Sequence, residues 1–552
     1  MLTRVLSAAL VGIEPYLVEV EVDLAGGLPA YQLVGLPAAA TVEGKVRIRG
    51  ALENSGFKVP PRKVSVNLAP ADVRKDGAAF DLPIAVGIAV AAGLAPADLL
   101  ADVLLLGELS LDGSIKPVRG ALPVAAFARA RRARGLILPA ACAAEAAVVD
   151  GVAVYAARAL GEVLAFLAGA GELPRARPAP AGPGPAAPPA DFSEVRGQAA
   201  AKRALEIAAA GGHNVILVGE PGCGKTMLAR RLPSILPALE VEETLAVSTV
   251  HSVAGLLGGA GLVAERPFRA PHHSISPAGL VGGGPQCRPG EVSLAHHGVL
   301  FLDELPEFAR PALEALRQPL EDRHVTIVRA RRAVTFPAAF TLVAAANPCP
   351  CGHCGSELRA CTCSPLQIAR YRARLSGPLL DRIDLHVPVA PIPYAELAGA
   401  AAGEGSAAIR DRVVRAREIQ RRRLAPYGLY CNAQMTTGLL ASECAVDALG
   451  DEALRRAVGR DGLSARGVDR VRKVARTIAD LRGAARLRGA DVILALQYRA
   501  LDRDDVDQPW RPRLEGAGFA AGATSPPSPA AGSAPTGLPG CATLGGAAAV
   551  SS

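Results

Sequence analysis

The stretch that decides the fold reads Gly219-Glu220-Pro221-Gly222-Cys223-Gly224-Lys225-Thr226. The apolar run Asn214–Val218 before it predicts a buried strand, and Met227–Leu232 after it predicts a helix. A glycine-rich turn between a strand and a helix lets backbone N–H groups surround phosphates, and the helix N-terminus adds positive potential. In such a loop Lys225 reaches the terminal phosphates and Thr226 binds Mg²⁺. The stretch therefore predicts an α/β domain with a site for ATP and Mg²⁺.

Two further strands are predicted to bring polar side chains to this site. The apolar run that starts at Val299 ends in two carboxylates, Asp303 and Glu304, which burial would penalise unless they had a function. Asp303 is predicted to hold Mg²⁺ and Glu304 to polarise the attacking water, with solvated acids at a strand end as the alternative. The strand Thr341–Ala346 is followed by Asn347, whose amide could orient water near the γ-phosphate.

Two arginines are candidates for stabilising charge in the transition state. Arg382 lies in the stretch Leu379–Asp384, and Arg466 lies in Leu463–Gly467. Either one could act as an arginine finger, and either could instead form a structural salt bridge.

Three longer stretches carry a family resemblance: Arg269–Ser276, Gly290–Phe308 and Gly377–His386. They resemble the magnesium-chelatase-like AAA+ proteins and, within them, the YifB/ComM family, from Met1 to about Arg503. The resemblance implies a homo-oligomeric ring, expected to be a hexamer, in which Arg382 reaches a neighbour's ATP and Arg466 is a sensor on the lid. It also implies an ATPase motor that acts on DNA, with branch migration during natural transformation as the leading function. The alternatives are an ATPase subunit that drives metal insertion into a tetrapyrrole and an ATP-gated assembly protein without translocation.

The N-terminal region resembles the Lon-protease-like fold (ribosomal protein S5 domain 2-like) in the stretches Lys75–Ile84 and Gly107–Val118. Lon proteases use a Ser nucleophile activated by a Lys. The matching positions here are Ala79 and Leu122, which supply neither the attacking oxygen nor its base. No peptidase activity is expected.

A chain of 552 residues is too long for one core, so several domains are expected. Alternating runs predict strands at Tyr16–Val22 and Lys63–Leu68, and helices are predicted at Leu82–Gly93 and Leu122–Arg134. The expected organisation is a Lon-like domain over residues 1–173, a Pro/Ala-rich linker over 174–190, an AAA+ α/β core over 191–395, a helical lid over 396–510 and a disordered tail over 511–552.

The net charge of +8 favours a polyanionic partner, and two segments concentrate arginine. Two β-type runs between Val325 and Pro337 flank Arg329, Arg331 and Arg332, which predicts a hairpin with a basic tip for DNA phosphates. A solvated surface turn is the alternative. The Arg-rich helix expected at residues 410–423 could present either a DNA-binding face or a solvated one.

A group of cysteines follows Asn347 closely, namely Cys349, Cys351, Cys361 and Cys363. Four thiolates suit tetrahedral Zn²⁺, with metal-free thiols or a redox disulfide as alternatives. The pairs His272-His273 and His296-His297 are expected to be structural. No uncharged run is long enough to span a bilayer, so a cytoplasmic location without membrane contact is expected.

Overall fold

The computed structural model describes residues 2–73, 75, 77–96, 100–179, 190–258, 261–284, 287–329, 332–392, 394, 403–499 and 501. The expected tail and most of the expected linker lie outside these residues.

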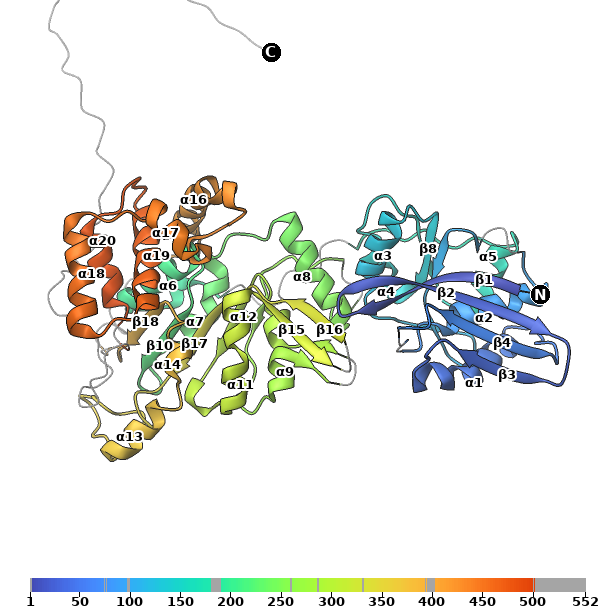
Figure 1. The fold of residues 1–552 in the computed structure, drawn as a ribbon, viewed down its shortest axis with the longest axis horizontal. Helices are drawn as coiled ribbons and strands as arrows, with labels where there is room; N and C mark the ends of the chain where they lie inside the picture. The colour runs from blue at the N-terminus through green and yellow to red at the C-terminus, as the bar shows by residue number, and fades with distance from the viewer. Residues whose placement is uncertain are drawn as a thin grey trace, which may run out of the picture. The chain divides into compact units, whose positions relative to one another are not determined.

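The N-terminal part is built on a seven-stranded sheet with strand order β3-β4-β2-β1-β5-β8-β9 (Figure 1). Along β2, buried Val and Leu side chains alternate with Glu and Asp, so one face of this strand packs on the core. The strands are β1 (Leu2–Val11), β2 (Glu14–Ala25), β3 (Ala30–Val34), β4 (Lys63–Ala69), β5 (Val103–Leu105), β8 (Gly135–Pro139) and β9 (Val154–Ala157). The helices are α1 (Ala39–Asn54), α2 (Asp81–Ala91), α3 (Ala121–Ala130), α4 (Ala140–Ala146) and α5 (Leu160–Leu167).

The two predicted strands of this region are confirmed, because they lie in β2 and β4. The first predicted helix, Leu82–Gly93, is confirmed as α2, although α2 ends two residues earlier, at Ala91. The second predicted helix is too long: α3 ends at Ala130 instead of Arg134. Arg132 has φ +56°, which stops the helix, and β8 begins at Gly135. The first residues of the expected linker extend the sheet, because Pro174 O accepts from the N–H of Ala156 at 3.0 Å.

The central part contains a five-stranded, all-parallel sheet with strand order β11-β14-β17-β10-β18. Both faces are covered, so neighbouring residues such as Val215 and Ile216 are buried in different clusters. The strands are β10 (Val215–Gly219), β11 (Phe268–Arg269), β14 (Val299–Leu302), β17 (Thr341–Ala346) and β18 (Leu385–Val389). The helices are α6 (Ala199–Gly211), α7 (Lys225–Ile235), α8 (Val241–Ala254), α9 (Pro277–Val281), α10 (Glu291–Leu294), α11 (Arg310–Ala315), α12 (Arg317–Asp322), α13 (Pro365–Arg372) and α14 (Gly377–Leu380).

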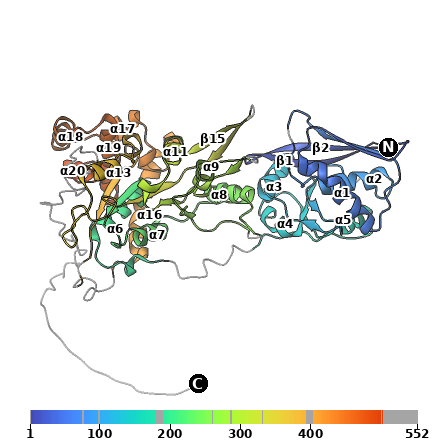
Figure 2. The ribbon, with the colours of Figure 1, turned by 90° about the horizontal axis from the view of Figure 1, so that it is seen from below.

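A separate hairpin belongs to this part of the chain. Strands β15 (His324–Arg329) and β16 (Arg332–Pro337) pair antiparallel, and Figure 2 shows β15 extending beyond α9. The predicted hairpin is therefore confirmed. At its tip, Arg331 and the side chains of Arg329 and Arg332 lie outside the described residues.

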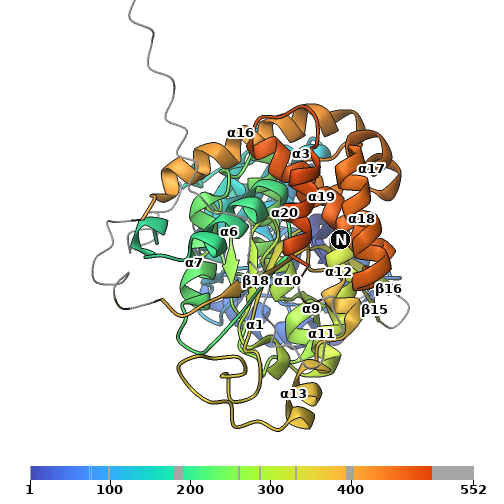
Figure 3. The ribbon, with the colours of Figure 1, turned by 90° about the vertical axis from the view of Figure 1, so that its left-hand side faces the viewer.

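The C-terminal part is helical, and α16 and α19 share one hydrophobic core with α6 and α7 (Figure 3). Three arginines of α16 hold it in place: Arg412 pairs with Glu206, Arg417 donates to Ala209 O, and Arg423 pairs with Asp480. Part of the predicted Arg-rich helix thus has a structural role. The helices are α16 (Ser406–Leu424), α17 (Thr437–Glu443), α18 (Ala448–Asp461), α19 (Ala465–Leu481) and α20 (Gly489–Gln497). No helix in the described part of the chain is both long and apolar enough to cross a membrane.

Candidate nucleotide-binding site

The glycine-rich loop joins the end of β10 to the start of α7, as the sequence predicts. A Cβ on Gly219 would lie 2.1 Å from Val389 O, so the neighbouring strand β18 leaves no room for a side chain there. Gly224 caps α7 with φ +92°, a conformation that glycine adopts without strain. The local backbone therefore explains why glycine is needed at these two positions.

Lys225 occupies the centre of the site. Its Nζ donates to Gly219 O at 2.6 Å and to Glu220 O at 2.8 Å, and it lies 3.1 Å from Asn347 Oδ1. Burial lowers the pKa of Lys225, while Cys223, Asp303 and Glu304 act in the opposite direction. The amino group thus lies next to the first residue after β17, as expected if Lys225 and Asn347 serve one site.

Thr226 and Asp303 form the part of the site suited to Mg²⁺. Thr226 Oγ1 donates to Asp303 Oδ2 at 2.8 Å, and Asp303 Oδ1 accepts from the N–H of Glu304 at 3.0 Å. A hydroxyl and a carboxylate are the oxygen ligands that a nucleotide-bound Mg²⁺ uses in phosphate-binding loops. The donor set therefore fits the ion.

Glu304 is held in an unusual backbone conformation just beyond β14. Its φ is +52°, in the left-handed region, and its side chain is about half exposed at 54%. A residue other than glycine in this region costs on the order of 1–3 kcal/mol, and such residues cluster at functional sites. His273 Nδ1 lies 3.8 Å from Glu304 Oε2. The sequence predicts only a structural role for His273, and no motif indicates that it lies next to the candidate base.

Glu220 links the phosphate-binding loop to the loop that follows β17. Its Oε2 accepts from Ser356 Oγ at 2.9 Å and lies 3.4 Å from His353 Nδ1. Neither residue was singled out from the sequence. The only local signal was their position in the cysteine-containing loop after Asn347.

The two candidate arginines lie in different surroundings. Arg382 is 8% exposed, and its Nη2 lies 2.6 Å from Glu321 Oε1. Arg466 is exposed in the first turn of α19. Within the described chain, neither side chain forms a hydrogen bond or ion pair with residues 219–226.

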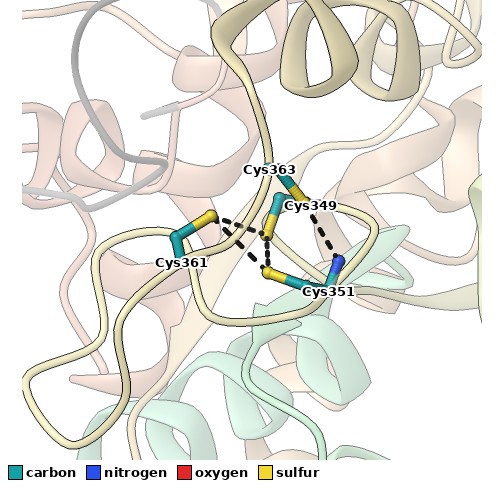
Figure 4. A group of neighbouring side chains, drawn as sticks. All are labelled: Cys349, Cys351, Cys361 and Cys363. Carbon is teal, nitrogen blue, oxygen red and sulfur yellow. Dashed lines mark hydrogen bonds between the residues drawn. The ribbon is translucent and has the colours of Figure 1, made fainter.

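The four predicted cysteines lie together in the loop after β17 (Figure 4). Their Sγ atoms are all within 4.8 Å of one another. This group could hold a metal ion. The predicted DNA contacts Arg329, Arg331 and Arg332 cannot be placed in the same way, because their side chains lie outside the described residues.

The fold and the loop define a class of protein. A parallel sheet places β17 between the phosphate-loop strand β10 and the acidic strand β14, and helices α16 to α20 follow the sheet. This arrangement is that of a P-loop nucleotide-binding domain of the AAA+ type.

Comparison with known families identifies the particular group. Residues 191–397 match the family described as "Magnesium chelatase, subunit ChlI", residues 20–142 match "Subunit ChlI of Mg-chelatase", and residues 403–499 match "Magnesium chelatase, subunit ChlI C-terminal". The chain is 43% identical over 507 residues to "Competence protein ComM" of Haemophilus influenzae, covering 91% of this chain and 98% of that protein. It is 41% identical over 504 residues to "Uncharacterized protein YifB" of Escherichia coli, with the same coverage of 91% and 98%. The chain belongs to the YifB/ComM family of magnesium-chelatase-like AAA+ proteins.

A shorter segment of the chain is similar to part of a protease. The chain is 31% identical over 151 residues to "Lon protease 2" of Bacillus subtilis, covering 25% of this chain and 26% of that protein.

Proposed function

We propose that this protein is an ATP-hydrolysing AAA+ motor that works as a homo-oligomeric ring on DNA. The observation that carries the proposal is the convergence of Lys225, Thr226, Asp303 and Asn347 at the ends of β10, β14 and β17. They come from three segments that are far apart in the sequence, and the proximity of these segments supports a site for ATP and Mg²⁺.

Each side chain has a distinct role in the proposed reaction. Lys225 neutralises the terminal phosphates, and Thr226 and Asp303 hold Mg²⁺. Glu304 accepts the proton of the attacking water, and Asn347 orients that water. His273 Nδ1, at 3.8 Å, would help to orient the carboxylate of Glu304.

Two arginines are proposed to act on ATP once the subunits have assembled into a ring. Arg382 is proposed to contact ATP bound by the neighbouring subunit, and Arg466 is proposed to report nucleotide state to the helical lid. Because Arg382 pairs with Glu321 in the single chain, its action in a ring requires that this ion pair opens.

The DNA substrate is the finer part of the proposal. The basic hairpin β15–β16 supports it, since guanidinium groups bind phosphates without reading sequence. The similarity to a protein named for competence supports DNA branch migration as the activity. The family's magnesium-chelatase descriptions keep a metal-insertion ATPase subunit as the alternative.

The N-terminal region is proposed to have the Lon-protease-like fold, supported by the partial match to Lon protease 2. It is proposed to act in assembly or DNA handling and not as a peptidase, because Ala79 and Leu122 stand at the positions of the catalytic pair. We also propose domains over residues 1–173, 191–395 and 396–510. The ranges matched by the three family descriptions support these boundaries.

The ATPase rate with and without forked DNA tests the proposed function. We expect Mg²⁺-dependent hydrolysis that forked or single-stranded DNA stimulates. Hydrolysis without any response to DNA would favour the metal-insertion or assembly alternatives, and no hydrolysis under either condition would contradict the proposal.

A further inference from the structure

The sulfur atoms of the cysteine loop are spaced as zinc ligands. Cys349 Sγ lies 3.3 Å from Cys351 Sγ and 3.7 Å from Cys361 Sγ, and the latter two sulfur atoms are 3.5 Å apart (Figure 4). Four thiolates at about 2.3 Å from a tetrahedral Zn²⁺ lie about 3.8 Å from one another. A disulfide requires about 2.05 Å, which is much shorter than the observed separations. The spacing fits a shared metal better than a covalent pair.

Backbone donors surround the same sulfur atoms. The N–H of Cys351 donates to Cys363 Sγ at 3.4 Å, and the N–H of Cys354 donates to Cys349 Sγ at 3.2 Å. Such contacts stabilise thiolates, and hydrogen bonds of this kind orient metal ligands in known sites. Cys349 is fully buried. Cys354 is not one of the four cysteines whose Sγ atoms lie within 4.8 Å of one another, and Arg372 Nη2 lies 3.9 Å from its Sγ.

This loop also touches the nucleotide site. Ser356 Oγ donates to Glu220 Oε2, and His353 Nδ1 lies 3.4 Å from the same oxygen. Gly352 packs on the phosphate-binding loop, because a Cβ at this position would lie 2.5 Å from Pro221 Cδ. No helix or strand is present between the end of β17 and the start of α13, all of which the structure describes. A cross-link by metal would order this loop without secondary structure.

We propose that Cys349, Cys351, Cys361 and Cys363 bind one Zn²⁺, and that the metal-closed loop positions the phosphate-binding loop through Glu220. The second half of this inference rests on the proposed function, whereas zinc binding does not. The Zn²⁺ ion takes no part in the hydrolysis of ATP itself. It acts by fixing the loop that carries Ser356 and His353.

Metal content tests the first half directly. The full-length chain, purified with reductant and without chelator, should contain about one zinc per chain by elemental analysis. The double variant Cys361→Ser/Cys363→Ser should lose it. Cys354→Ser is the matched control, because it removes a fifth cysteine of the same loop and should retain zinc. A zinc-free wild-type protein, disulfides among the four cysteines, or equal zinc loss in Cys354→Ser would overturn the inference.

Nucleotide binding tests the second half. Removal of zinc by a chelator, with folding checked by circular dichroism, should weaken binding of a fluorescent ATP analogue by about fivefold or more. Ser356→Ala should keep zinc and also weaken binding, which tests the contact even if the metal-free chain unfolds. Unchanged affinity in both would refute the coupling. A zinc-containing wild-type protein that binds no nucleotide would instead refute the proposed function.

Discussion

Thr226 Oγ1 and Asp303 Oδ2 are hydrogen-bonded at 2.8 Å, although the two residues belong to different elements of the central domain. Thr226 lies in the first turn of α7, and Asp303 follows β14 directly. A hydroxyl and a carboxylate at this separation can both bind one Mg²⁺. This contact links the phosphate-binding loop to the acidic strand.

Asp303→Asn should raise the Mg²⁺ concentration needed for half-maximal hydrolysis by about tenfold or more, because an amide oxygen lacks the charge of a carboxylate. Metal titration of the ATPase rate measures this effect. Asp411→Asn, an exposed acid on α16, is the control and should leave the titration unchanged. An unaltered Mg²⁺ requirement in Asp303→Asn would rule out this residue as a ligand.

Mixed rings test the action of Arg382 across subunits. Homogeneous Lys225→Ala and Arg382→Ala proteins should both be inactive, since each lacks a cation that acts on the phosphates. Mixing the two should restore part of the hydrolysis, because some interfaces then contain both intact groups. If verified mixed rings stay inactive, Arg382 either acts within its own subunit or is structural through its ion pair with Glu321.

The hairpin arginines should bind DNA through its phosphates. Replacing Arg329, Arg331 and Arg332 with Ala should weaken binding to all sequences and flatten the log–log salt slope by roughly two to three. Basal ATPase activity should remain. The control is Arg410→Ala/Arg415→Ala on the exposed face of α16. An effect of this size in the control and none in the hairpin variant would move the DNA site to α16.

His296 should make the stability of the central domain, which contains the five-stranded sheet, depend on pH. Burial, together with neighbouring His297, lowers the pKa of His296 to about 3, and its Nδ1 accepts from the N–H of Ala339 at 3.0 Å. The unfolded chain binds this proton below about pH 6.5, so the free energy of unfolding falls as pH decreases. The loss attributable to this residue is about 2 kcal/mol at about pH 5.

Urea unfolding at about pH 7.5 and about pH 5 measures this effect. His296→Gln, which cannot titrate, should show a fall in stability that is about 2 kcal/mol smaller than in the wild type. An identical fall in both proteins would show that His296 takes up its proton without cost in the folded state.

Local sequence patterns predicted the elements that carry the candidate site. Apolar runs that end in polar residues predict strands β10 and β17 and the turn after β14. The glycine-rich loop in turn predicts a strand before it and a helix after it. The helix expected up to Arg134 was wrong at its end, because apolar periodicity does not reveal the left-handed Arg132.

Contacts that loop side chains make around the site could not be predicted from the sequence. The approach of His273 to Glu304 and of Ser356 to Glu220 depends on how loops pack, and no local spacing encodes it. Likewise, the sequence shows the arginines of α16 only as one cluster of charge and does not indicate their partners. Only the fold shows that Arg423 reaches Asp480 in α19.

ATP turnover by Glu304→Gln tests the central claim most directly. Gln keeps the shape of the side chain but cannot accept the proton of water, so this protein should bind ATP and Mg²⁺ normally and hydrolyse ATP at least about 100-fold more slowly. Glu307→Gln, an exposed acid three positions further on, is the control and should keep wild-type turnover. Wild-type turnover in Glu304→Gln, with ATP bound, would contradict the proposed site.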